Sequence, residues 1–183
     1  MKGLVLIGDY YEDTELIATI DVLLRHNEEL VLASMMKRND VTSKLNLVVH
    51  YDKLIEEVSL NNFDFLFIPG GPGSFQVLSN IPQVDLIIDH FVKNNKLVAS
   101  ICAAPFLVGR LGHLNNHSFT CYPGFEKQVV GGTYFRDKGV VRDGNFITGK
   151  SMYYSIDLGL EIIEYFYGKE EKEKLKLSLM GEE

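Results

Sequence analysis

The sequence predicts an α/β protein with a mostly parallel sheet that helices cover on both faces. Near-continuous apolar runs, typical of strands buried on both faces, alternate along the chain with segments of helical periodicity. Strands that alternate with helices favour parallel pairing. Ligands of such sheets bind beyond the carboxyl ends of the strands. We therefore expect the site among the loops GDYYEDTE, PGGPGS and CAAP, which follow three of the predicted strands.

The first three elements are a strand, a helix and a strand. KGLVLIG at residues 2–8 is an apolar run that stops at a glycine, and ELVLAS at 29–34 is a second run. Between them, residues 14–25 have helical periodicity. The apolar side chains predicted to share one face of this helix are Leu16, Ile17, Ile20, Leu23 and Leu24.

The middle of the chain continues the alternation. LNLVVHYD at 45–52 is a predicted strand, and an amphipathic segment follows it through Leu60. FDFLFIPGG at 63–71 is an apolar strand that ends in two glycines, and KLVASI at 96–101 is the next strand. The helix predicted between them covers 82–93, with a buried face of Val84, Ile87, Ile88, Phe91 and Val92.

The last part of the chain adds shorter elements. AAPFLVGRLG at 103–112 is a predicted helix that ends near its last glycine, and SFTCY at 118–122 is a short strand. Residues 140–148 form a predicted hairpin around an Asp-Gly pair, which is a strong turn signal. A long helix is expected over 151–167. We expect the following tail, with leucines at 175, 177 and 179, to pack on the surface.

Composition and charge narrow the classes of function. The 183 residues, 46% hydrophobic and 23% charged, indicate one soluble globular domain over 1–183. The net charge is −7 without a basic stripe, so a nucleic-acid partner is not expected. Asp9 interrupts the first apolar run too early for a signal peptide, and no run is long enough for a membrane span. With no export signal and only two cysteines, we expect a reducing, cytoplasmic location, and the lack of a membrane span favours no membrane partner.

Cys102 is the leading candidate for a nucleophile. It directly follows the predicted strand 96–101, and small residues and Pro105 open the next helix. A sharp strand-to-helix turn with small neighbours is the geometry of a nucleophile elbow. A helix N-terminus favours an anion, so we expect a lowered pKa for the thiol. The alternative is that Cys102 is simply a small buried hydrophobe, because free cysteines are often buried.

Glu15 and a glycine pair are candidate partners of this thiol. Glu15 lies in the first turn of a helix that follows a strand end, so its carboxyl group can reach the same crevice. A protonated carboxyl group there would donate a hydrogen bond to a thiolate. The alternative role of Glu15 is that of a first-turn acid. Gly70 and Gly71 can bring backbone N–H groups to an oxyanion, or they can form a plain turn.

Three segments resemble the ThiJ/PfpI superfamily, in the branch of the Parkinson disease protein deglycase. They are YEDTELIATIDVLLR at 11–25, FLFIPGGPG at 65–73 and ASICAAPFLV at 99–108, and TCYPGFEK at 120–127 and the segment 147–168 are compatible. The combination is specific, and it covers nearly the whole chain. The resemblance implies a flavodoxin-like three-layer sandwich with a mostly parallel central sheet and a cysteine nucleophile elbow, usually in a homodimer.

The resemblance also implies roles for residues. It implies a reactive Cys102, with Glu15 as the acid that hydrogen-bonds its sulfur. It suggests oxyanion donors from the backbones of Gly71 and Ala103, and a strained backbone at Cys102. Gly70 and Tyr122 are expected to line the site. Relatives are glyoxalases that need no glutathione, deglycases, redox-regulated chaperones and, in another branch, peptidases.

Departures from the family pattern narrow these activities. Peptidase-like members have His directly after the elbow cysteine, whereas this chain has Ala103, so a peptidase or amidase lacks its base. Tyr122 stands where other members have His; it is a hydroxyl donor or fills space, and a phenol is a poor base at neutral pH. GKSMYYS at 149–155 replaces a Gly-Pro-Gly turn that borders the site in relatives.

The expected function is a cysteine-dependent glyoxalase or deglycase that uses no cofactor and no metal. Its expected substrate is a small reactive aldehyde, such as methylglyoxal, or a glycated adduct. The main alternative is a redox sensor or chaperone controlled by oxidation of Cys102, because both functions need the same thiol. His113 and His117 have the spacing of a helical metal pair, but the surrounding Gly and Asn residues favour a turn.

Overall fold

The computed structural model describes residues 1–51 and 53–182. Its centre is a sheet, and most of the strands in it are those that the sequence predicts. Within these residues, seven strands pair in the order β10-β11-β7-β6-β1-β2-β5. All pairs are parallel except β10 with β11. The strands are β1 (Lys2–Ile7), β2 (Glu29–Ser34), β5 (Lys53–Leu54), β6 (Phe65–Ile68), β7 (Leu97–Ile101), β10 (Val140–Asp143) and β11 (Phe146–Gly149).

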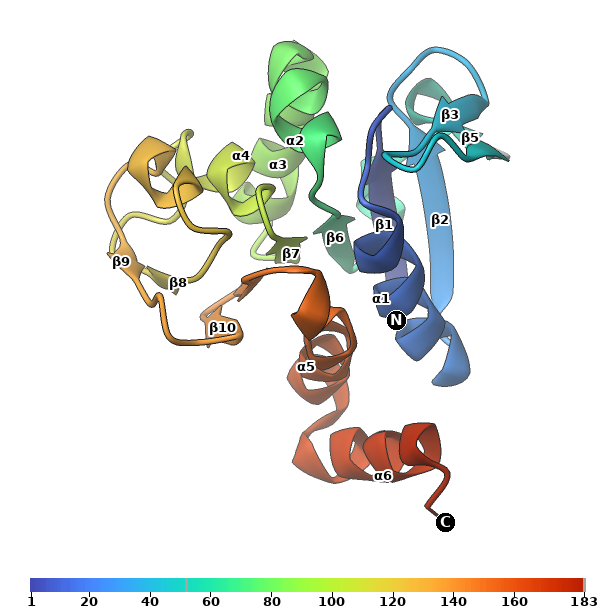
Figure 1. Cartoon of the computed structure of the whole chain (residues 1–183), viewed down its shortest axis with the longest axis vertical. Coiled ribbons are helices and arrows are strands. Elements are labelled where there is room, and N and C mark those ends of the chain that lie inside the picture. The colour runs from blue at the N-terminus through green and yellow to red at the C-terminus, as the bar shows by residue number, and fades with distance from the viewer. Residues whose placement is uncertain (52, 183) are drawn as a thin grey trace.

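Helices cover both faces of this sheet. The α-helices are α1 (Asp13–Arg25), α2 (Pro72–Gln76), α3 (Pro82–Lys93), α4 (Pro105–Gly109), α5 (Ser155–Tyr167) and α6 (Lys169–Met180). Helices α1 and α5 lie on the side of the sheet opposite α3 and α4 (Figure 1). The short 3₁₀ helices are η1 (Ile55–Glu57), η2 (Leu60–Asn62), η3 (Leu78–Asn80), η4 (Phe125–Gln128) and η5 (Met152–Tyr154).

Alternation along the strands divides the hydrophobic core into two parts. In β1, Leu4 and Leu6 contribute to the cluster under α3 and α4, whereas Val5 and Ile7 contribute to the cluster under α1 and α5. All four side chains are fully buried, as expected for a strand inside a doubly covered sheet. The fold is therefore the predicted flavodoxin-like, three-layer α/β sandwich.

The buried face of α1 differs from the predicted one. Ile17 and Leu24 are 55% and 51% exposed, so their assignment to the buried face was wrong. Helix α1 packs closely on α5, where Gly159 lies directly against Val22. This contact turns α1 so that Thr19 and Val22 are buried in place of the two larger residues.

The segment predicted as a strand at 45–52 does not join the central sheet as such. Residues 48–50 form β4 (Val48–His50), which pairs antiparallel with β3 (Asp40–Thr42) in a separate hairpin. Asp52 lies outside the described residues. The edge of the central sheet is instead completed by the two-residue strand β5, which pairs with β2.

Several predicted elements are shorter in the structure. β6 ends before Pro69, which cannot donate to a ladder. Helix α4 spans only five residues, and α5 begins at Ser155 after η5. The strand predicted at 118–122 is reduced to β8 (Ser118–Phe119), which pairs with β9 (Thr133–Tyr134). The hairpin of β10 and β11 is confirmed, and Gly144 at φ 58° forms its turn.

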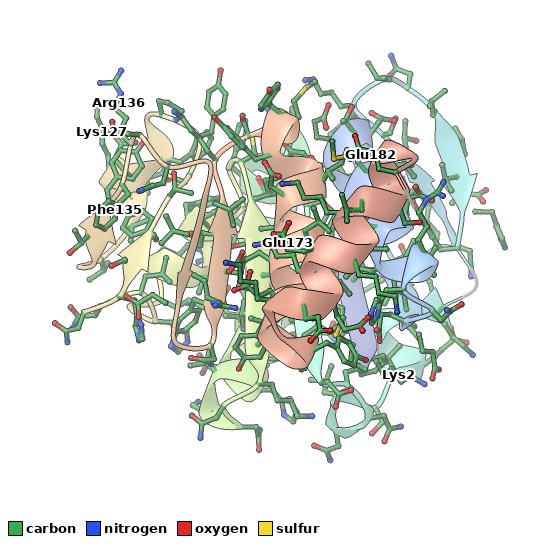
Figure 2. All side chains as sticks on the ribbon, turned by 90° about the horizontal axis from the view of Figure 1, so that it is seen from below. Lys2, Lys127, Phe135, Arg136, Glu173 and Glu182 are labelled. Carbon is green, nitrogen blue, oxygen red and sulfur yellow. The ribbon has the colours of Figure 1, made fainter. Side chains whose placement is uncertain are left out.

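The tail after residue 168 forms α6, which packs on α5. Lys172 lies 2.7 Å from both Glu161 and Glu164 of α5, and Leu175 is buried. In Figure 2, α6 crosses in front of α5, with Glu173 labelled on it. None of the helices within the described residues is long and apolar enough to cross a membrane.

Candidate functional site

The loops that follow β1, β6 and β7 meet at one edge of the sheet, as predicted. Glu12 N donates a hydrogen bond to Gly70 O at 3.1 Å, which joins the first loop to the second. Gly73 N donates to Tyr10 O at 2.9 Å in the same contact. A Cβ atom on Gly71, whose φ is 86°, would lie 2.6 Å from Glu12 N, so glycine is required for this approach.

Cys102 occupies the strained position of an elbow. Its φ is 62°, a left-handed conformation that costs a non-glycine residue of order 1–3 kcal/mol. Two hydrogen bonds hold it: Cys102 N donates to Gly149 O at 2.9 Å, and Cys102 O accepts from Tyr122 N at 2.8 Å. The side chain is half-buried. The strain that the family resemblance implied at Cys102 is therefore present.

Glu15 is positioned beside this cysteine by the start of α1. The Glu12 side chain caps the helix by accepting a hydrogen bond from Glu15 N at 2.8 Å. The Glu15 side chain is buried, accepts a hydrogen bond from Gly70 N at 2.9 Å, and is hydrogen-bonded to Cys102. A Cβ atom on Gly70 would lie 2.6 Å from Glu15 Oε2 and 2.7 Å from Cys102 Cβ. The absence of a side chain at residue 70 thus permits the contact between acid and thiol.

Burial sets the protonation of this pair. Loss of hydration raises the pKa of Glu15 from 4.5 to about 7, although the hydrogen bonds from Cys102 and Gly70 and the positive charge of Lys44 oppose this change. The carboxyl group therefore carries a proton in a large fraction of molecules at neutral pH, as a hydrogen-bond donor to sulfur must.

The pKa of the Cys102 thiol is raised, so the predicted lowering was wrong. Burial is the main cause, and the charge of the Glu15 carboxylate and its hydrogen bond add to it. The N–H groups of Gly71 and Ala103, which are hydrogen-bonded to the sulfur, act in the opposite direction. The five-residue α4 does not outweigh burial. When the Glu15 carboxyl group is protonated, it is neutral and no longer repels a thiolate at Cys102.

A cavity of about 440 Å³ opens over the thiol. Five of the predicted site residues line it: Glu15, Gly71, Cys102, Ala103 and Tyr122. Gly70 lies beneath, between Glu15 and Cys102. The remaining lining residues are Glu12, Lys44, Pro72, Phe75, Phe125, Ser151 and Met152.

Sequence reasoning missed part of this wall. Ser151 and Met152 were not missed entirely, because they belong to the segment 149–155, which borders the site in relatives. Phe75 and Phe125 have rings 5.2 Å apart and come from separate segments, so no local pattern joins them. Lys44 is brought in by the hairpin of β3 and β4, which carries no motif.

Tyr122 lines the cavity while its neighbour lies in the core. Tyr122 is 50% exposed, and Cys121 is fully buried. The two neighbours are thus separated between cavity and core, although β8 ends at Phe119 and Tyr122 lies in a bend.

No imidazole is available to the thiol. None of the five histidines, all of which are in the described part of the chain, lines the cavity. His113 Nε2 lies 2.6 Å from Asp89, and His117 Nδ1 lies 3.3 Å from Asp143. In residues 1–51 and 53–182, no group of three or more His, Cys, Asp or Glu side chains could hold a metal ion.

Comparison with known proteins agrees with this geometry over most of the chain. Residues 1–165 match the DJ-1/PfpI family. The chain belongs to this family. Protein dj-1beta of Drosophila melanogaster is 29% identical over 180 residues, which cover 98% of this chain and 96% of the relative. A deglycase of Pyrococcus abyssi is 34% identical over 151 residues, which cover 82% of this chain and 90% of the relative.

Solved structures of the DJ-1/PfpI family superimpose closely on this chain. The crystal structure of Drosophila DJ-1beta has a TM-score of 0.90 at 28% identity and covers 98% of this chain and 97% of its own. An oxidized DJ-1 of Toxoplasma gondii has the same TM-score, identity and shares of both chains. These likenesses agree with the mostly parallel sheet and its flanking helices.

Proposed function

We propose that this DJ-1/PfpI protein is a cysteine-dependent, glutathione-independent glyoxalase or deglycase that acts on small reactive aldehydes. The observation that carries the proposal is the direct contact between the Cys102 thiol and the buried Glu15 carboxyl group inside a cavity of about 440 Å³. A nucleophile and a proton carrier whose pKa is about 7 are the groups that aldehyde isomerisation requires. The relatives named deglycases support a reactive carbonyl substrate.

The proposed reaction begins when the Glu15 carboxylate takes the proton of the Cys102 thiol and the sulfur adds to the aldehyde carbon of methylglyoxal. The new S–C bond converts the carbonyl oxygen into an alkoxide, which takes the proton from Glu15 and gives a hemithioacetal. The N–H groups of Gly71 and Ala103, which are hydrogen-bonded to the sulfur, are the proposed donors to this oxygen.

Glu15 then transfers a proton between the two carbons of the adduct. Its carboxylate removes the proton from the former aldehyde carbon and returns it to the neighbouring carbon. The hydroxyl proton of the hemithioacetal passes to the former ketone oxygen, which gives a lactoyl thioester. Water hydrolyses the thioester to lactate and releases the thiol. Every atom comes from methylglyoxal and one water molecule, so the reaction needs no cofactor.

Formation of lactate from methylglyoxal without glutathione tests the proposal. The parent protein should produce lactate, Cys102→Ser should produce none above buffer, and Glu15→Gln should be about 10²–10⁴-fold slower, as for loss of a general acid–base group. Glu173→Gln on the exposed surface of α6 is the matched control and should keep full activity. Absence of lactate with the folded parent protein would overturn the proposal.

Redox sensing through Cys102 is the second candidate function. It is supported by the half-buried sulfur, which lies against a protonated acid and two N–H donors, and by the oxidized form of the Toxoplasma relative. A sensor should gain two oxygen atoms at Cys102 under mild peroxide, and intact mass measures this gain. The same dose should leave the mass of Cys102→Ser unchanged. The cavity does not favour a peptidase, because it offers no histidine base.

We also propose that the protein is a homodimer, which would explain the exposed apolar residues of α1. Ile17 and Leu24 share one outward face, and the neighbouring hairpin of β3 and β4 exposes Leu45, Leu47 and Val48. Leu45 N donates to Asp13 Oδ2 at 3.3 Å, so the two surfaces adjoin. Light scattering should show a dimer for the parent and monomers for Ile17→Glu. Leu86→Glu, at a more exposed site on α3, should remain dimeric.

A further inference from the structure

One positive charge lies at the proposed catalytic cavity and has no role in the mechanism above. Among the described residues that line the cavity, Lys44 is the only cation. The other ionisable side chains in this wall are Glu12, Glu15, Cys102 and Tyr122. Without Lys44, the wall would hold acidic groups alone.

The backbone of Lys44 is fixed, whereas its ammonium group is free to bind. Lys44 N donates to Tyr11 O at 2.9 Å, and the buried Ser43 Oγ accepts from Leu45 N and Leu47 N, each at 3.2 Å. Within residues 1–51 and 53–182, by contrast, no carboxylate lies within 4.0 Å of Lys44 Nζ and no acceptor is hydrogen-bonded to it.

The two carboxyl groups of the cavity have other tasks. Glu12 caps α1 by accepting the hydrogen bond from Glu15 N, and its charge lies at the positive end of the helix. Glu15 is bound to Gly70 N and to the thiol. Lys44, whose charge acts on Glu15 without forming an ion pair, therefore offers an unpaired positive charge in the wall of the same cavity as the nucleophile. One ammonium group balances one negative charge, which is the charge of a carboxylate.

We propose that Lys44 determines substrate charge, and that the cavity selects aldehydes that carry a carboxylate over neutral aldehydes of the same size. This inference rests on the proposed function in one respect, which is that Cys102 reacts with the substrate. The carboxylate is held by Lys44 at the mouth of the cavity while the aldehyde carbon meets the sulfur. Glyoxylate and glyoxal are the matched charged and neutral probes.

Alkylation of Cys102 tests the charge preference without any turnover. Iodoacetate and iodoacetamide have nearly the same shape, and with each the sulfur displaces iodide as the S–C bond forms. In Lys44→Gln, the ratio of the iodoacetate rate to the iodoacetamide rate should fall by about threefold to fivefold, the strength of an exposed ion pair. Lys44→Arg should keep the ratio of the parent. Salt should lower the ratio in the parent and not in Lys44→Gln.

A substitution at a second lysine distinguishes an effect of charge at the cavity from an effect of the net charge of the protein. Lys176→Gln, on the exposed surface of α6, removes the same charge far from the cavity and should leave the ratio unchanged. The proposal is overturned if Lys44→Gln keeps the parent ratio, or if both variants lower it equally. In the parent, glyoxylate should protect Cys102 from iodoacetamide at lower concentration than glyoxal, and Lys44→Gln should remove that difference.

The outcomes distinguish this inference from the proposed function. If Lys44→Gln changes the alkylation ratio and no lactate is formed, the charge selection stands and the glyoxalase proposal falls. If lactate is formed and the ratio does not depend on Lys44, the glyoxalase proposal stands and Lys44 has no part in selection.

Discussion

Replacement of Glu15 by glutamine should stabilise the protein at alkaline pH and have little effect at acidic pH. The folded protein holds the Glu15 proton up to a pKa of about 7, whereas the unfolded chain releases it near the ordinary value of 4.5. Between these values the folded state binds more protons, so stability falls as the pH rises. The stabilising effect is complete below about pH 4.5 and is lost as the pH rises through about 7. Glutamine stays neutral throughout.

The size of this effect follows from the two pKa values. The difference between 4.5 and about 7 corresponds to about 3 kcal/mol in the free energy of unfolding. Because the carboxyl group is buried, solvent screens this energy little. For a chain of this size, about 3 kcal/mol also corresponds to a change of roughly 6–12 °C in melting temperature.

Urea unfolding followed by circular dichroism at pH 4 and pH 8.5 measures the effect. Both proteins carry Cys102→Ser, so that only residue 15 titrates in the pair. The free energy of unfolding of the Glu15→Gln protein, relative to its Glu15 parent, should rise by about 3 kcal/mol between these pH values. Glu173→Gln is the exposed control and should show no such rise. An equal difference at both pH values would refute the reasoning from burial.

Three further predictions follow from individual contacts. Gly70→Ala should lower the free energy of unfolding by about 1–3 kcal/mol, because the new Cβ would meet Glu15 and Cys102. It should also lower the rate of lactate formation at least about tenfold. Unchanged values in both assays would contradict this reading. Limited iodoacetamide should label Cys102 and not the fully buried Cys121 in the folded protein. Peptide mass mapping measures the labelling, and equal labelling of both cysteines would contradict this prediction. Gly159→Ala should lower the melting temperature, because its Cβ would lie 2.8 Å from Val22 Cβ. Val22→Ala in the same chain should recover part of this loss. If the two substitutions instead lower the melting temperature additively, the contact is excluded.

The parts of the fold that sequence predicts are those that local patterns determine. The strands were found because both faces of β1, β6 and β7 are buried, which leaves almost no polar residue in them. Cys102 and Glu15 were placed together because parallel strands bring their carboxyl ends to one edge of the sheet. The segment around Cys102, together with the segments at 11–25 and 65–73, also resembled a known family, and the resemblance covered most of the chain.

The parts that were missed depend on contacts between distant segments. The exposure of Ile17 and Leu24 is set by the packing of α1 on α5, which helical periodicity does not contain. Lys44 reaches the cavity only because a hairpin folds against the start of α1. The direction of the Cys102 pKa depends on how deeply the sulfur is buried and on the charge of its neighbour, and neither follows from the position of a turn.

The hydrogen bonds that hold the backbone of Cys102 also bear on how the protein is made. A growing chain contains Cys102 long before it contains Gly149, whose carbonyl group accepts from Cys102 N. Until that later segment leaves the ribosome and β11 joins β7, the elbow lacks one of its two restraints. During this interval the thiol belongs to an unfinished chain, without the complete frame that holds it next to Glu15. Oxidation at this stage of synthesis would act on a cysteine that has not yet acquired its special surroundings.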